Sequence, residues 1–221
     1  MSIAHSFLGC KYTPMNNKTD LTKTHRAYYS ATTAPAMLDL EPINYLAIAG
    51  SGDPGKPAFT EAVQALYPVA YAIKFLCKAE GHDFVVPKLE GLWWFDDSYS
   101  GISMSEAPRR VPRDAWQWKL LIRMPDPVTK KMVTQAIEQI IGKKDIARVT
   151  DVTFLTMHEG KCAQILHVGP FDREIETLQV LQVFLEKQGF KKNGHHHEIY
   201  LTDMRKTAPA RLRTILREPV A

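Results

Sequence analysis

The stretch Tyr45-Leu46-Ala47-Ile48-Ala49 begins an order of elements that the chain runs through twice. This short apolar run predicts a buried strand, and residues 50–55, with three glycines and a proline, predict a tight turn. Apolar residues at helical spacing then predict a helix over residues 58–78. The chain returns as a predicted strand at Leu89-Glu90-Gly91-Leu92-Trp93-Trp94-Phe95.

The second pass follows the same order. It begins with the strand Cys162-Ala163-Gln164-Ile165-Leu166-His167-Val168, turns at a Gly-Pro pair, and continues as a helix over residues 172–188. It returns as the strand His197-Glu198-Ile199-Tyr200-Leu201, so each pass ends with an acidic residue among aromatic side chains. Because a groove between two related halves is a natural ligand site, we expect Glu90 and Glu198 to face one cavity.

The chain around these two passes completes an α+β pattern. Residues 98–114, rich in Ser, Gly, Pro and Arg, predict a loop that lies over the groove. Residues 116–122 predict a strand, Pro127 opens a helix with an apolar stripe, and a last helix is predicted from Thr207. We expect helices on one face of an antiparallel sheet, with a bend or break at Pro68 in the first helix.

The first 40 residues lack a sustained apolar period and predict a polar, loosely structured lead-in. They offer no pair of periodic helices, which argues against a transcription regulator with its own helix-turn-helix. The chain therefore divides into an N-terminal extension, residues 1–40, and a ligand-binding domain, residues 41–221. That domain consists of two units, at about residues 41–110 and 111–221.

Composition narrows the class of protein. The net charge of +4 is small for 221 residues and the basic residues are scattered, which argues against a nucleic-acid track. No apolar run approaches the ~18 residues that a membrane span needs, and the N-terminus lacks the charged leader of a signal peptide. Three dispersed cysteines without a CxxC pair favour reduced thiols. We therefore expect a cytoplasmic protein that binds neither nucleic acid nor membrane.

Glu198 and Tyr200 carry the clearest chemical signal. They are two residues apart on a strand and point from the same face, whereas Ile199 and Leu201 are expected to point toward the helix layer. A Glu in an apolar, aromatic site can act as a general base or acid near neutral pH. A Tyr hydroxyl beside it can donate a hydrogen bond to a developing oxyanion. The alternative is a solvent-facing strand with an inert Glu and Tyr.

Four tryptophans form a second signal. Trp93 and Trp94 are adjacent on a strand and must point to opposite faces, while Trp116 and Trp118 share a face of the next strand. Gly91 in mid-strand often marks a bulge or the close approach of a ligand. Aromatic walls hold flat molecules by stacking and area burial. Packing into the core is the alternative for each ring.

The histidines His195-His196-His197 invite a metal ion only at first sight. Consecutive residues of a strand alternate between faces, so three neighbours rarely chelate one ion. The turn at residues 50–55 lacks the Lys-Ser/Thr ending of a P-loop and the spacing of a dinucleotide fingerprint. We therefore expect no metal and no cofactor.

Four pieces of the chain together resemble the GyrI-like small-molecule-binding family. They are Gly50-Ser51-Gly52-Asp53-Pro54, Lys88-Leu89-Glu90-Gly91-Leu92-Trp93-Trp94, Asp114-Ala115-Trp116-Gln117-Trp118 and His197-Glu198-Ile199-Tyr200-Leu201. The resemblance covers about residues 40–220 and is to the stand-alone branch rather than to effector domains of transcription regulators. It implies duplicated β-α-β-β (SHS2-type) modules with a pseudo-twofold groove for flat, often cationic or aromatic compounds.

Some stand-alone members of this family are cyclopropanoid hydrolases, which open the cyclopropane of DNA-alkylating natural products with water. Carried onto this chain, the resemblance implies catalytic roles for Glu198 and Tyr200. It implies ligand-binding roles for Glu90, Trp93, Trp94, Trp116 and Trp118. The expected function is hydrolysis of flat hydrophobic electrophiles, a detoxification that confers drug resistance.

Other functions remain open on the sequence. A non-catalytic binder or sensor of aromatic or cationic drugs would use the same aromatic walls. A module that binds a partner protein and a haem-binding relative are further alternatives, the latter resting on the three histidines alone. A homo-oligomer is compatible with the sequence.

Overall fold

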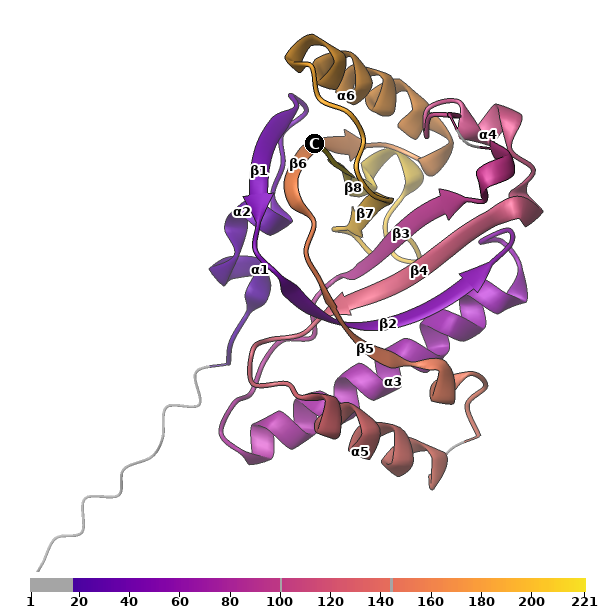
Figure 1. Cartoon of the computed structure of the whole chain (residues 1–221). Coiled ribbons are helices and arrows are strands. Elements are labelled where there is room, and N and C mark those ends of the chain that lie inside the picture. Colours follow the sequence, from indigo (N-terminus) through magenta and orange to yellow (C-terminus); the bar gives the residue numbers. More distant parts are fainter. Residues whose placement is uncertain (1–17, 100, 144) are drawn as a thin grey trace, which may run out of the picture.

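One antiparallel sheet organises the chain (Figure 1). The computed structural model describes residues 18–99, 101–143 and 145–221. Within these residues eight strands pair in the order β1-β6-β8-β7-β3-β4-β2-β5. The strands are β1 (Ala36–Leu40), β2 (Ile43–Ser51), β3 (Leu89–Phe95), β4 (Trp116–Arg123), β5 (Thr153–Met157), β6 (Gly160–Val168), β7 (His196–Tyr200) and β8 (Arg213–Pro219). The predicted α+β class with an antiparallel sheet is confirmed.

The helices connect these strands and cover the sheet. They are α1 (Leu21–Thr24), α2 (Arg26–Tyr29), α3 (Pro57–Ala79), α4 (Ala107–Arg110), α5 (Lys130–Ile141) and α6 (Glu174–Gln188). Thr129 caps α5 by accepting a hydrogen bond from the Met132 N–H, and Gly189 ends α6 in a left-handed conformation with φ 74°. α3 continues through Pro68 as one helix of 23 residues rather than two helices end to end.

The strand order is symmetric about the central β3–β7 pair. On one side lie β4, β2 and β5, and on the other lie β8, β6 and β1. The two outermost strands are exchanged, because β1 precedes β2 in the chain but pairs with β6, and β5 precedes β6 but pairs with β2. β2 and β3 of the first predicted unit lie on one side together with β4 and β5 of the second, whereas β6, β7 and β8 of the second unit lie on the other side. That the units are copies of one module stays a prediction.

The two faces of the sheet are both covered. On the helix face, α3 and α5 lie under one end of the sheet and α6 covers the other (Figure 1). The opposite face, here called the N-terminal face, packs against α1 and α2. Strand residues of the helix face include Leu46, Ile48, Trp93, Leu120, Ile165 and Leu216. Those of the N-terminal face include Tyr45, Leu121, Cys162, Ile199 and Ile215.

Residues 18–40 are ordered into elements that the sequence did not predict. Leu21, Tyr28 and Tyr29 of α1 and α2 are buried against the sheet, and β1 extends it by pairing with β6. The expected loose lead-in is therefore wrong for these residues, because a few apolar side chains that are too sparse for a period still reach the core. The first 17 residues of the predicted extension lie outside the described residues, and a domain boundary at residue 40 stays a prediction.

The predicted last helix is also wrong. Pro209 lies in a 3₁₀ turn, and Arg213–Pro219 forms β8, which pairs with both β6 and β7. Leu212, Ile215 and Leu216 fit helical spacing, but on β8 Ile215 and Leu216 point to opposite faces and are both fully buried. A strand that is buried on both faces shows no alternation that would mark it in the sequence.

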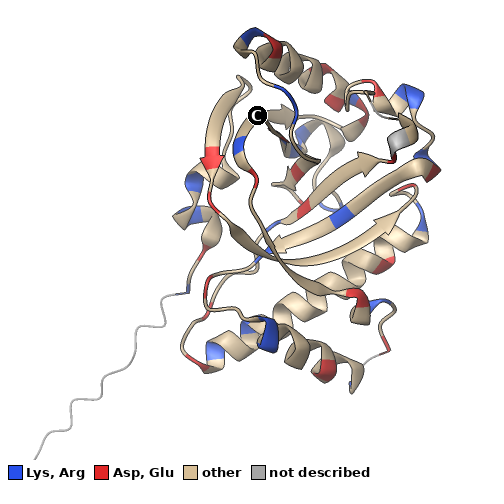
Figure 2. Ribbon diagram, in the orientation of Figure 1, with Lys and Arg blue, Asp and Glu red and all other residues tan. Residues whose placement is uncertain are grey.

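Charged residues are dispersed over the ribbon, with basic and acidic positions interspersed (Figure 2). This agrees with the scattered charge of the sequence. No helix within the described residues is long and apolar enough to cross a bilayer.

Candidate functional site

β7 presents His196, Glu198 and Tyr200 on the helix face, since alternate residues of a strand share a face. Ile199 lies on the other side, in the core beneath α1 and α2. The prediction that Glu198 and Tyr200 face away from the helix layer is therefore wrong. The cause is the N-terminal segment, which provides an apolar layer for Ile199 that the sequence pattern did not reveal.

Gly91 brings three groups of the site together. It lies opposite Glu198 in the β3–β7 pair, and the Trp93 Nε1–H donates a hydrogen bond of 3.1 Å to the Tyr200 hydroxyl above it. A Cβ at Gly91 would stand 2.9 Å from both Trp93 Nε1 and the Tyr200 oxygen. The missing side chain therefore allows the Tyr hydroxyl and the indole N–H to meet beside Glu198.

Two buried carboxylates meet at this point. Glu198 is 8% exposed and Glu174, in the first turn of α6, is equally buried. Burial, and then the charge of Glu198, hold the pKa of Glu174 well above its usual range. Burial and the hydrogen-bonded Glu198 carboxylate likewise raise the pKa of Tyr200. Their surroundings thus favour the protonated form of both neighbours of Glu198.

His196 lies on the other side of Glu198. Its Nε2 is 3.5 Å from Glu198 Oε1, and its Nδ1 is 2.7 Å from Glu218 Oε1. The second oxygen of Glu218 is 3.0 Å from Lys192 Nζ at the surface. Burial alone would lower the pKa of His196, but Glu218 and Glu198 outweigh it and raise the pKa above 6.5.

Aromatic rings surround the hydroxyl end of the site. Trp93 stacks on Phe59 of α3 with centroids 5.9 Å apart and meets Trp116 edge to face at 5.9 Å. Trp118 is fully buried beneath Phe59, so the core alternative applies to this ring, and it lies against Gly50, whose absent Cβ would clash with the indole. Of the two tryptophans on β3, Trp93 is the one on the face of Glu198.

Two predicted ligand-binding residues lie on the N-terminal face instead. Trp94 stacks on His195 with centroids 4.4 Å apart. Glu90 is fully buried and accepts hydrogen bonds from Tyr28 and Tyr29. The expectation that Glu90 and Glu198 face one cavity is wrong, because residues 90 and 198 stand one register position apart in the β3–β7 pair and therefore point to opposite faces.

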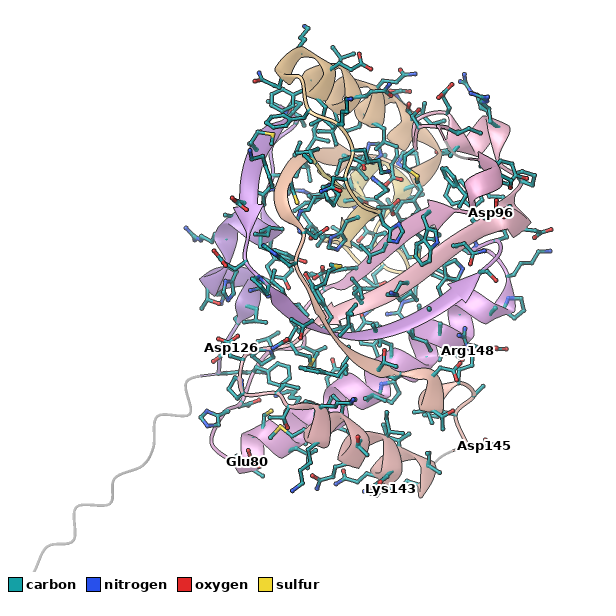
Figure 3. The ribbon with its side chains drawn as sticks, viewed as in Figure 1. Glu80, Asp96, Asp126, Lys143, Asp145 and Arg148 are labelled. Carbon is teal, nitrogen blue, oxygen red and sulfur yellow. The ribbon has the colours of Figure 1, made fainter. Side chains whose placement is uncertain are left out.

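The connection between β3 and β4 is described at residues 96–99 and 101–115, and the second of these segments contacts both Trp116 and α6. Asp96, labelled in Figure 3, begins the connection at the end of β3. The Trp116 Nε1–H donates to the Val111 carbonyl at 3.3 Å, and the Ser105 hydroxyl donates to Gln182 of α6 at 3.1 Å. Met104 and Ala107 of this connection are buried in the same core as Trp93. A cavity of about 270 Å³ lies elsewhere, next to α1.

Sequence reasoning missed Glu174, His196 and Glu218. His196 shares the two-residue spacing of Glu198 and Tyr200 on one strand, a signal that was available. Glu218 was hidden by the wrong assignment of β8 as helix, and Glu174 resembles any acidic residue in a first helical turn. The histidine triplet divides as alternation requires, with His196 and His197 on opposite faces. The described residues contain no cluster of three or more potential metal ligands.

The chain is similar to a known protein family and to several solved structures. The model of the GyrI-like small molecule binding domain matches residues 130–221. Among curated proteins no significant match was found. The structure of an uncharacterized conserved protein from Listeria innocua is 36% identical and superposes with a TM-score of 0.83, covering 92% of this chain and 100% of that one. A hydrolase from Listeria innocua has the same identity and coverage with a TM-score of 0.79. The C-terminal domain of EcmrR, 14% identical, shares the fold alone, with a TM-score of 0.50 over 85% of this chain and 96% of that one.

Proposed function

The chain belongs to the GyrI-like small-molecule-binding family, and on that premise we propose that it hydrolyses flat, hydrophobic electrophiles. The reaction is the opening of a cyclopropane conjugated to a dienone by water. A related structure, 36% identical over the full length of that chain, is described as a hydrolase, which supports this choice.

One observation carries the proposal. A carboxylate (Glu198), a tyrosine hydroxyl (Tyr200) and an indole N–H (Trp93) converge over Gly91, and Glu198 and Trp93 are buried, the latter in the same core as Met104 and Ala107. A base and an oxyanion donor within reach of one another in an apolar site are what such a hydrolysis requires.

The chemistry divides among three residues. Glu198 takes a proton from water, whose oxygen bonds to the ring methylene while the ring C–C bond breaks and its electron pair moves through the dienone to oxygen. Tyr200 donates a hydrogen bond to that oxygen as it becomes a phenolate. Glu174, protonated at neutral pH, supplies the proton that makes it a phenol. Transfer of the proton held by Glu198 to Glu174 then restores the site.

Substrate entry requires residues 101–115 of the connection between β3 and β4 to move aside. The ring system of the substrate then stacks against Trp93 and Trp116, which in the described structure lie in the same core as the apolar residues of this connection. The connection is held by apolar contacts of Met104, Ala107 and Val111 with the core and by the Ser105–Gln182 hydrogen bond, and both must be released for the substrate to enter. A lid of this kind also excludes water other than the attacking one.

The test is mass spectrometry of a spirocyclopropane alkylating agent incubated with the protein. The parent should add one water, and Glu198→Gln should do so 10²–10⁴-fold more slowly, the scale of general acid–base groups. Glu90→Gln is the matched control, since it changes the same group on the other face and should leave the rate within a few-fold. Hydrolysis at the parent rate by Glu198→Gln would remove Glu198 from the mechanism.

A second candidate is a binder of cationic aromatic drugs without turnover. It is favoured by the two carboxylates, Glu174 and Glu198, that meet next to aromatic rings, because a cation would bind between them with the release of the Glu174 proton. Unchanged compound that co-elutes with the protein would support this function over hydrolysis. In either case the two described cysteines are free and buried, which suits the reducing cytoplasm in which we place this detoxification and drug resistance.

A further inference from the structure

A line of charged groups leads from the protein surface to Glu198. Lys192 Nζ, 43% exposed, lies 3.0 Å from Glu218, and Glu218 lies 2.7 Å from His196 Nδ1. His196 is fully buried, and its Nε2 lies 3.5 Å from Glu198 Oε1. The three buried members come from adjacent strands, β8 and β7, so their spacing is fixed by backbone pairing rather than by flexible loops.

Two atoms at the inner end of this line are unsatisfied. His196 Nε2 and Glu174 Oε1 are both buried and have no hydrogen-bond partner among the described residues. Buried polar atoms are nearly always partnered, so orphans that gather around one carboxylate call for a functional explanation. In contrast, Nδ1 of the same imidazole has a short contact with Glu218, which fixes the plane of the ring.

We propose that His196, clamped by Glu218, is a positioning residue that orients the Glu198 carboxylate toward the attacking water. The Glu218 contact at Nδ1 holds the ring with its Nε2 3.5 Å from one oxygen of Glu198, in the way that a carboxylate orients the imidazole of a catalytic triad. The inference deepens the proposed hydrolysis and rests on it.

The charge of His196 follows from its surroundings. The groups that face it are Glu218 from β8, Glu198 and Tyr200 from β7, Glu174 from α6 and, beyond Glu218, Lys192. The nearest two are carboxylates, which raise the pKa of His196 and so favour the imidazolium, the form with a proton on both ring nitrogens. Activity that depends on the imidazolium should fall as the pH rises through the raised pKa of His196.

The test is the pH dependence of kcat and KM for the same spirocyclopropane probe. His196→Gln should lower kcat about 10–100-fold, because a misplaced base loses near-attack geometry, with KM within about twofold and with the alkaline fall in kcat gone. Glu218→Gln should move that fall to lower pH, since it removes a charge that raises the pKa of His196. His197→Gln is the control, a buried histidine between two carboxylates on the other face, and should leave the pH profile in place.

The outcomes separate the two proposals. An unshifted alkaline fall in Glu218→Gln, alongside normal turnover by the parent, overturns the role of His196 while hydrolysis stands. If the parent does not hydrolyse the probe, the proposed hydrolysis is rejected. The titration of the His196 imidazole is then followed by ¹⁵N NMR. If the His196 imidazole titrates at the same pH in the parent and in Glu198→Gln, the contact between His196 and Glu198 is overturned. A His196 titration at lower pH in the variant would support this contact.

Discussion

His196 and His197 are neighbours in sequence, fully buried, and each stands between two glutamates, yet their surroundings differ. On the N-terminal face His197 lies 3.0 Å from Glu90 and 2.9 Å from Glu159, and every partner is held again by others. Arg217 donates to Gln164 at 2.9 Å and to the Tyr28 carbonyl at 2.9 Å, and its guanidinium lies 4.3 Å from the Tyr28 ring centroid. On the helix face His196 has one short contact and one orphaned nitrogen.

The difference separates a hydrogen-bond network in which every described group has a partner from one that leaves polar atoms without partners. Around His197 the charges balance and the hydrogen bonds close, so the network ties α1 and α2 to the sheet and offers nothing to a ligand. Around Glu198 polar atoms lack partners and aromatic rings stand beside them. Both clusters contain perturbed pKa values, so a perturbed pKa alone would not have told the two faces apart.

The largest expected effect tests the closed network. Arg217→Met should lower the free energy of unfolding by about 3–5 kcal/mol, because it leaves the buried Glu159 without one of its two cations. Urea unfolding followed by circular dichroism measures this. A loss below about 1 kcal/mol would mean that the N-terminal face does not hold the chain together, and the contrast between the faces would fail.

The next effect is the pH dependence of stability. Burial lowers the pKa of His197, but Glu159 and Glu90 outweigh it and raise the pKa to about 9. The resulting stabilisation is complete below an ordinary pKa near 6.5 and is lost as the pH rises through about 9. It amounts to roughly 3 kcal/mol.

Thermal unfolding of the parent and of His197→Gln at pH 6 and pH 10 measures this contribution. The parent should lose more stability than the variant over that interval. Equal losses in the two proteins would show that His197 is not the group responsible.

The smallest effect sharpens the description of the helix face. Because the pKa of Glu174 is raised in the folded protein, this residue destabilises the fold as the pH rises above its ordinary pKa of 4.5. Glu174→Gln should therefore be neutral or stabilise by up to about 1 kcal/mol at pH 7, and hydrolysis of the probe should slow. Equilibrium unfolding and the mass-spectrometric assay measure the two effects. A clear loss of stability would mean that Glu174 is a structural carboxylate like Glu159.

Most of the secondary structure was accessible from local pattern. The strand at residues 89–95, the helix at 172–188 and the strand at 197–201 were predicted within a few residues, because Gly and Pro bound them and their apolar spacing is clear. β8 and the elements in residues 18–40 were not predicted. A strand that is buried on both faces, and a short segment with isolated apolar residues, show no periodic pattern of apolar and polar residues.

The site was predicted in part for a related reason. Spacing along one strand placed Glu198 with Tyr200, but the pairing register between strands decides that Trp93 joins them and that Glu90 does not. A one-residue change in register would reverse both results. Long-range contacts such as Glu218 with His196 have no local signature at all.

The exchanged edge strands make the order of synthesis matter. β1 leaves the ribosome early, yet its partner β6 lies more than a hundred residues further along the chain, with Ala36 pairing with Gln164. Such distant pairing gives the fold a high contact order and slow folding. Until the second half emerges, the nascent first half carries an open strand edge of the kind that promotes aggregation. Neither half can close its own sheet, so the two halves are obliged to mature together.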